Sequence, residues 1–223
     1  MRNHPARIVL VTDASRGVGA AVARQLTGSD THVIVNYRRS PHQADAVADS
    51  IRDAGGHAST LAADISDAAE TTAMVDSIAT RFGRLDAMVL DASGGLGAAP
   101  DAGQTPRLNR DAYRRLAQLA IPLMPVGGRI VFATSHQAHF FPAKAVPKGY
   151  AAVAAGMRAG ETALFTKRSE FARAGIQFTV VSGDLTAPLP AVAEFTTAIV
   201  RSVRTPSPSG MVYVGSANYL MTA

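Results

Sequence analysis

The chain has 223 residues, which is enough for one domain with a substantial core and too few for two. It has no cysteine, no cluster of metal-ligating residues, no signal peptide and no apolar run of membrane-spanning length, so we expect a cytoplasmic protein without disulfides, metal or membrane partner. Its net charge of +5 is scattered along the chain and only 6% of residues are aromatic, which argues against nucleic-acid binding.

Short apolar runs alternate with longer, amphipathic, alanine-rich segments. The apolar runs predict strands at 7–12, 32–37, 58–63, 85–91, 129–134, 176–182 and 211–214. The segments between them predict helices at 17–28, 41–54, 67–82, 109–124, 149–174 and 191–203. This alternation predicts an α/β fold: a single Rossmann-type domain over 1–223, with a doubly wound, seven-stranded parallel sheet and helices on both faces. A ligand crevice is then expected at the carboxyl ends of the strands.

A glycine-bearing turn joins the first predicted strand to the first helix. Gly17 and Gly19 let the backbone approach a pyrophosphate, which would rest on the helix N-terminus. Asp13 lies in the same turn and tolerates a left-handed backbone better than most residues. Its carboxylate either turns outward or caps the helix, or it repels the pyrophosphate and weakens binding.

The turn from Thr12 to Gly19 resembles the Thr-Gly-x-x-x-Gly-x-Gly fingerprint of the short-chain dehydrogenase/reductase family, with Asp13 in place of the first glycine. Two later segments are also similar to that family. Ala63-Asp64-Ile65 resembles its adenine-contacting pair, and Leu90-Asp91-Ala92-Ser93-Gly94 stands where the family has Asn-Asn-Ala-Gly. The resemblance covers almost the whole chain.

The family's catalytic serine and tyrosine also have counterparts. The fifth strand is followed by Ser135, and Tyr150 comes fifteen residues later. The resemblance implies that Ser135 orients a substrate carbonyl, that Tyr150 donates or accepts the proton, and that Asn109 completes a proton relay. The lysine that the family places four residues after this tyrosine is replaced by Ala154. Arg158 either folds back toward the site or is exposed or faces a dimer partner.

The resemblance also implies a dinucleotide cofactor. Arg38 and Arg39 follow the second strand and, with Arg16, suit a ribose 2′-phosphate, which favours NADP(H) over NAD(H); the alternative is that they are ordinary loop arginines. The predicted cofactor-binding residues are Thr12, Ser15, Arg16, Gly17, Val18, Gly19, Tyr37, Arg38, Arg39, Asp64, Ile65, Asp91, Ala92, Ser93 and Gly183.

Two further features bear on the active site. His136 and His139 follow the catalytic serine and serve either as alternative acids or bases or as loop residues that cover the entrance. The sixth strand ends in Ser182-Gly183-Asp184, where the family has Pro-Gly, and the segment after it is short. We therefore expect a more open pocket than the family usually has.

These features predict an NADP(H)-dependent short-chain oxidoreductase, a carbonyl or ketone reductase with an altered catalytic site, acting on a small-molecule carbonyl or alcohol. The alternative is a redox-silent protein of the same fold that senses a cofactor, binds a partner or performs non-redox acid/base catalysis. The resemblance also implies a homodimer or homotetramer through the helices after the fourth and fifth strands. Small residues there permit close helix approach, or pack against the chain's own sheet: Ala151, Ala152, Ala155 and Gly156.

Overall fold

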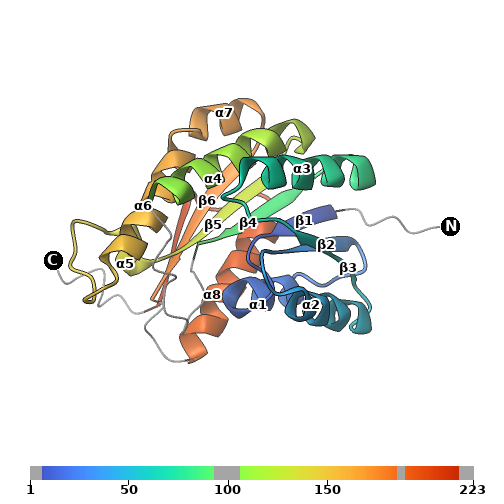
Figure 1. The fold of residues 1–223 in the computed structure, drawn as a ribbon, viewed down its shortest axis with the longest axis horizontal. Coiled ribbons are helices and arrows are strands. Elements are labelled where there is room, and N and C mark those ends of the chain that lie inside the picture. The colour runs from blue at the N-terminus through green and yellow to red at the C-terminus, as the bar shows by residue number, and fades with distance from the viewer. Residues whose placement is uncertain (1–6, 93–105, 185–188, 216–223) are drawn as a thin grey trace.

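One parallel sheet of seven strands organises the molecule (Figure 1). The computed structural model describes residues 7–92, 106–184 and 189–215, with side chains described from 110 in the second range and from 192 in the third. The strand order is β3-β2-β1-β4-β5-β6-β7. The strands are β1 (Arg7–Val11), β2 (Thr31–Tyr37), β3 (His57–Ala62), β4 (Ala87–Asp91), β5 (Arg129–Ser135), β6 (Gln177–Gly183) and β7 (Met211–Val214).

Helices cover both faces of the sheet, so the central strands are buried on two sides, whereas the edge strands β3 and β7 are only partly buried (Figure 1). One face packs against α3 (Ala68–Phe82), α4 (Pro106–Ala120) and α6 (Ala151–Phe165), and the other against α1 (Gly17–Gln25), α2 (Pro41–Asp53) and α8 (Leu189–Arg204). The shorter helices are the 3-10 turn η1 (Ile121–Leu123), α5 (His136–His139) and α7 (Arg168–Arg173).

The alternation of side chains along a strand explains why a central strand such as β1 has apolar residues on both of its faces. In β1, Ile8 and Leu10 join the core under α3, α4 and α6, whereas Val9 and Val11 join the core under α1, α2 and α8. β1 pairs with β2 on one side and with β4 on the other. The strand order therefore runs in opposite directions from β1, through β2 to β3 on one side and through β4 to β7 on the other. Ligands of such sheets bind at the point where the order reverses. The predicted fold class is confirmed.

The predicted helix at 149–174 is wrong as one element. It divides into α6 and α7, because α6 ends at Thr166, whose hydroxyl donates to the Ala163 carbonyl at 2.7 Å. The break lets α7 turn so that Phe171 is buried against Phe178.

The predicted helix at 109–124 begins earlier, at Pro106, and gives way after Ala120 to η1, where Pro122 has no backbone N–H to continue the helix. The predicted strand at 85–91 begins at Ala87. The short helix α5 was not predicted. None of the helices in the described ranges combines the length and hydropathy needed to cross a membrane.

Candidate active site at the carboxyl ends of the strands

The turn between β1 and α1 is tightly built. A Cβ on Gly19 would lie 2.7 Å from the Asp13 carbonyl oxygen, so only glycine fits there. Gly17 has a φ of 57° and Asp13 a φ of 48°, both left-handed. Asp13 thus adopts a left-handed backbone, which aspartate tolerates better than most residues, in a region where non-glycine residues are uncommon.

Asp91, at the end of β4, fastens that strand to the turn. Its carboxylate accepts the Gly19 N–H at 3.0 Å, and its own N–H donates to Thr12 Oγ1 at 3.0 Å. The Asp91 carbonyl accepts the hydroxyl of Tyr113 at 3.3 Å, and burial together with Asp91 and Asp13 raises the pKa of Tyr113 well above its ordinary value. A carboxylate at the N-terminus of α1 also interacts favourably with the helix dipole.

Of the first amides of α1, that of Gly19 is bound by the Asp91 carboxylate, and Arg16 at the N-cap makes no side-chain capping hydrogen bond to the others. Burial raises the pKa of the Asp13 carboxyl, and the nearby charges of Arg16 and Arg38 oppose that effect. Arg38 pairs with Asp64 at 3.5 Å. A helix N-terminus that its N-cap residue leaves open, beside exposed arginines, suits a phosphate group, so the residues present fit a dinucleotide.

The other predicted cofactor residues lie around this turn. Thr12, Ser15, Val18 and Ala92 are buried; Tyr37, Asp64 and Ile65 are half-buried; Arg16, Gly17, Arg38 and Arg39 are exposed. Gly183 pairs in register with Ser135, and a Cβ on it would lie 2.5 Å from the Phe195 ring. Ser93 lies outside the described residues, as does the Asn109 side chain, whose backbone belongs to the first turn of α4.

The structure brings Ser135 and Tyr150 together. Ser135 Oγ and Tyr150 Oη are 3.4 Å apart, at the end of β5 and the start of α6. Ser135 caps α5, because its Oγ accepts the Ala138 N–H at 3.0 Å. That bond occupies a lone pair and leaves the serine proton to be donated elsewhere.

Tyr150 is the N-cap residue of α6 and packs against the hydrophobic core on that side. Its hydroxyl also lies 3.6 Å from Met157 Sδ. Ala154, one turn beyond the tyrosine, is fully buried in the core. The side chain at the lysine position therefore carries no charge and offers no hydrogen bond to the tyrosine.

His136 is fixed by hydrogen bonds at both ring nitrogens. Its Nε2 donates to the Val214 carbonyl at 3.1 Å, so its Nδ1 accepts from Ser182 Oγ at 2.8 Å. Burial lowers the pKa of His136, which agrees with this neutral form. The geometry favours a structural role that ties β5 to β6 and β7.

His139 belongs to a buried charged network. Its Nδ1 donates to Glu161 Oε1 at 2.8 Å, its Nε2 lies 3.2 Å from Tyr213 Oη, and Arg158 donates to Glu161 Oε1 at 2.6 Å. The Glu161 side chain is fully buried and its Oε2 has no partner. Arg158 thus binds Glu161 and does not reach back to Tyr150. Sequence reasoning missed Glu161, although an acid on an alanine-rich helix, seven residues after Ala154, is a signal.

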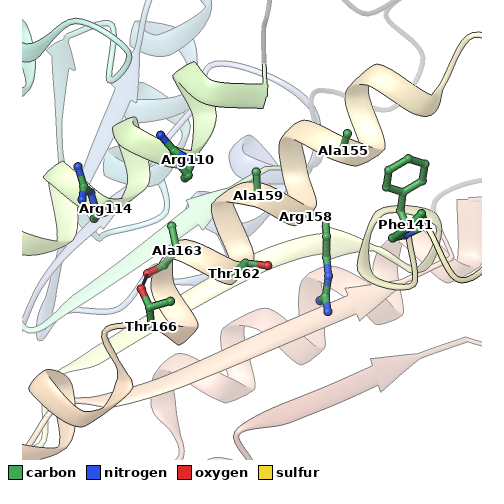
Figure 2. A pocket seen from close by; sticks show the side chains of 10 residues that line it. Arg110, Arg114, Phe141, Ala155, Arg158, Ala159, Thr162, Ala163 and Thr166 are labelled. Atoms are coloured by element: carbon green, nitrogen blue, oxygen red, sulfur yellow. Dashed lines mark hydrogen bonds between the residues drawn. The ribbon is translucent and has the colours of Figure 1, made fainter.

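An open groove of about 670 Å³ lies between α4 and α6 (Figure 2). Figure 2 shows Arg110 and Arg114 on one helix and Arg158 on the other, with small side chains between. Neither Ser135 nor Tyr150 lines it. Its lining residues are Arg110, Arg114, Phe141, Pro142, Ala155, Arg158, Ala159, Thr162, Ala163 and Thr166.

Of the small α6 residues singled out in the sequence, Ala151 and Ala152 are exposed, Ala155 is half-buried in the groove and Gly156 is buried. The described residues contain no group of three side chains that could hold a metal ion.

A family model and several curated proteins match this chain. The family model described as short chain dehydrogenase matches residues 7–188. Elsinochrome reductase 1 of Elsinoe fawcettii is 34% identical over 148 residues, which cover 64% of this chain and 54% of that protein. The 1-cyclohexenylcarbonyl-CoA reductase of Streptomyces collinus is 32% identical over 186 residues, covering 80% and 64%. The matched segments thus span little more than half to about two thirds of these relatives.

Solved structures agree in fold. A short chain dehydrogenase from Burkholderia cenocepacia J2315 in complex with NADP is 26% identical, with a TM-score of 0.77 over 98% of this chain and 100% of that one. The reductase LugOII, which catalyses keto-reduction at C1 during lugdunomycin biosynthesis, is 24% identical, with a TM-score of 0.76 over 99% and 100%.

Proposed function

The chain belongs to the short-chain dehydrogenase family, and we propose that it is an NADP(H)-dependent carbonyl reductase with an altered catalytic site. The observation that carries the proposal is the 3.4 Å approach of Ser135 Oγ to Tyr150 Oη. These two hydroxyls lie at the carboxyl end of β5, two strands from the phosphate turn at the end of β1. A carbonyl oxygen held between them meets two hydrogen-bond donors, which is the electrostatic help that a forming alkoxide needs.

The roles of the two hydroxyls follow from their partners. Ser135 Oγ already accepts the Ala138 N–H, so its proton is available to the substrate oxygen and orients the carbonyl. Tyr150 then transfers its proton to the same oxygen as negative charge develops there. The nicotinamide, when bound, supplies the hydride. The N-terminus of α1 and the exposed Arg16, Arg38 and Arg39 would hold its phosphates.

Two comparisons support NADP(H) and a carbonyl substrate. The Burkholderia cenocepacia relative is a complex with NADP. Elsinochrome reductase 1 and the probable tetrahydroxynaphthalene reductase of Zymoseptoria tritici, which is 35% identical over 149 residues, are both named as reductases. We therefore propose aromatic ketones and quinones as the first substrates to test.

A redox-silent protein is the second candidate, and Ala154 favours it. A lysine at that position would place a cation beside the tyrosine, whereas the Tyr150 hydroxyl contacts Met157 Sδ and Ser135 Oγ. Without that cation the tyrosine is a weaker proton donor, and the reaction slows. Such a protein would bind the cofactor without turning it over.

The decisive experiment measures binding and turnover separately. We expect NADPH to bind in a calorimetric titration and to be oxidised slowly when aromatic ketones and quinones are added. Binding without oxidation of NADPH by any of them would favour the redox-silent protein. No binding at millimolar NADPH would rule out the reductase.

We also propose that the chain forms a homodimer or homotetramer through α4 and α6. The support is the open groove between these helices, whose lining on α6 includes the small residues Ala155, Ala159 and Ala163. Small side chains allow two helices to approach closely. Light scattering on the purified protein tests this: replacing Ala159 by Glu should reduce the oligomer's mass to that of a monomer, whereas an unchanged mass would place the interface elsewhere.

A further inference from the structure

One buried hydrogen-bond acceptor next to the reactive serine is left without a partner. Gln137, in the first turn of α5 and two residues after Ser135, is 6% exposed, and its Oε1 forms no hydrogen bond. Burying an amide oxygen without a donor costs stability, so such a group needs a reason. Gln137 follows the end of β5, where we propose that a carbonyl compound binds.

The orientation of the amide is fixed by its neighbour. Gln137 Nε2 donates to Asp184 Oδ1 at 3.4 Å. Turning the amide over would set its oxygen against that carboxylate, which is repulsive, so the unpaired atom is the oxygen and not the nitrogen. The side chain therefore presents an acceptor, and its complement is a donor.

Asp184, which holds this amide, lies at the strand end next to that of Ser135. Asp184 follows Gly183, and Gly183 is the register partner of Ser135. The Asp184 N–H lies 3.4 Å from the Val214 carbonyl, which His136 Nε2 also contacts. The ends of β5, β6 and β7 are thus joined beside the serine by hydrogen bonds to the Asp184 carboxylate and the Val214 carbonyl.

We propose that Gln137 determines substrate specificity by accepting a hydrogen bond from a hydroxyl group of the substrate. The inference rests on the proposed reductase function and extends it: the substrate is a hydroxylated carbonyl compound, such as a phenolic ketone. A site built to bind a hydroxyl discriminates strongly against an analogue that cannot donate, because the buried acceptor is then left unpaired.

The test uses matched pairs of tetralones in which each aromatic position carries either a hydroxyl or a methoxy group. Both groups contain oxygen, but only the hydroxyl donates. For each pair, kcat/KM and the dissociation constant in the presence of NADPH are measured. We expect one hydroxyl isomer to be preferred over its methoxy partner by roughly tenfold in both quantities, the contribution of about one hydrogen bond in a buried site.

Two variants assign the preference to the amide. Gln137→Leu should bring the ratio to about one, because the acceptor is gone. Asp184→Asn should lower it, because the amide is no longer held in one orientation, and this variant keeps the test valid if Gln137→Leu does not fold. The matched control is Gln177→Leu: Gln177 also has a buried, unpaired Oε1, but it lies at the opposite end of β6. Its ratio should equal that of the wild type.

The outcomes separate this inference from the proposed function. Equal kcat/KM and equal affinity for every hydroxyl and methoxy pair would overturn the inference, as would a preference that survives in Gln137→Leu. A binding preference without oxidation of NADPH would overturn the reductase and support the role of Gln137. Reduction of both members at equal rates would support the reductase and overturn the role of Gln137.

Discussion

The two ends of the crevice use their hydrogen-bonding groups differently. At the phosphate turn, carboxylates occupy the space: Asp91 takes the Gly19 amide, and Asp13 is held in a left-handed conformation with its ionised form disfavoured by burial. At the carbonyl end, Ser135 and Tyr150 contact each other and have donors to offer. The hydrogen bonds of the turn therefore stabilise the turn itself, whereas the hydroxyl pair is the part of the crevice that we propose binds the substrate.

The largest effect is expected at the carbonyl end. Replacing Tyr150 by Phe removes the proton donor, so kcat for ketone reduction should fall by roughly 10²–10⁴. The affinity for NADPH, measured by calorimetry, should not change. Tyr213→Phe is the matched control, because this tyrosine on β7 is 44% exposed and contacts His139 instead of Ser135. Equal rates for Tyr150→Phe and the wild type would remove the reason for assigning chemistry to this end.

The second largest effect is expected on stability, at the contact between α5 and α6 that Glu161 makes with His139. Glu161→Gln leaves Arg158 without its carboxylate and weakens the bond to His139, which anchors α5 to α6. Because Arg158 is partly exposed and can be rehydrated, we expect a loss of about 1–3 kcal/mol in the free energy of unfolding in urea.

The control for that change is Glu170→Gln. Glu170 also accepts from a base three residues away, Lys167 at 2.7 Å, but its side chain is 39% exposed. We expect at most about 0.5 kcal/mol there. A similar loss in both variants would show that the burial of Glu161 does not increase its contribution to the free energy of unfolding.

The contrast between the two ends also separates what the sequence could and could not predict. The continuous apolar runs predicted all seven strands, because a strand such as β1 is buried on both faces. The fifteen-residue spacing of Ser135 and Tyr150 predicted their approach only through a family resemblance. The contact between Asp91 and Gly19 joins residues 72 positions apart, and the unpaired oxygen of Gln137 depends on Asp184, 47 positions away. No local pattern encodes such contacts.

A lysine can be introduced at position 154, where the family has its catalytic lysine and this chain has Ala154. Ala154→Lys places an ammonium one helical turn beyond Tyr150 and should stabilise the tyrosine anion, raising kcat about tenfold and moving the pH optimum downward. Because Ala154 is fully buried, the variant should also lose about 1–3 kcal/mol of stability. Ala154→Met has a similar bulk without charge and separates packing from electrostatics. No gain over Ala154→Met would show that the cation is not what limits the reaction.

The smallest effect is expected at the phosphate turn, where Asp13→Gly relieves a left-handed φ and removes a negative charge. We expect NADPH to bind roughly fivefold more tightly at neutral pH, a change of about 1 kcal/mol. Asp13→Asn keeps a side chain that tolerates this conformation and isolates the effect of charge. Calorimetry with both variants measures the two contributions.

The raised pKa of Asp13 also predicts how the stability of the folded chain depends on pH. The pKa of Asp13 in the folded chain lies above the 3.8 of the free side chain, because burial disfavours the ionised form. The folded protein therefore binds that proton more tightly than the unfolded chain, and the resulting stabilisation is full below pH 3.8 and lost as the pH rises through the folded pKa. Asp13→Asn should match the wild type in acid and become the more stable of the two toward neutral pH, as followed by urea unfolding. A difference that shrinks toward neutral pH would mean that Arg16 and Arg38 outweigh burial, and the turn would then be suited to its carboxylate after all.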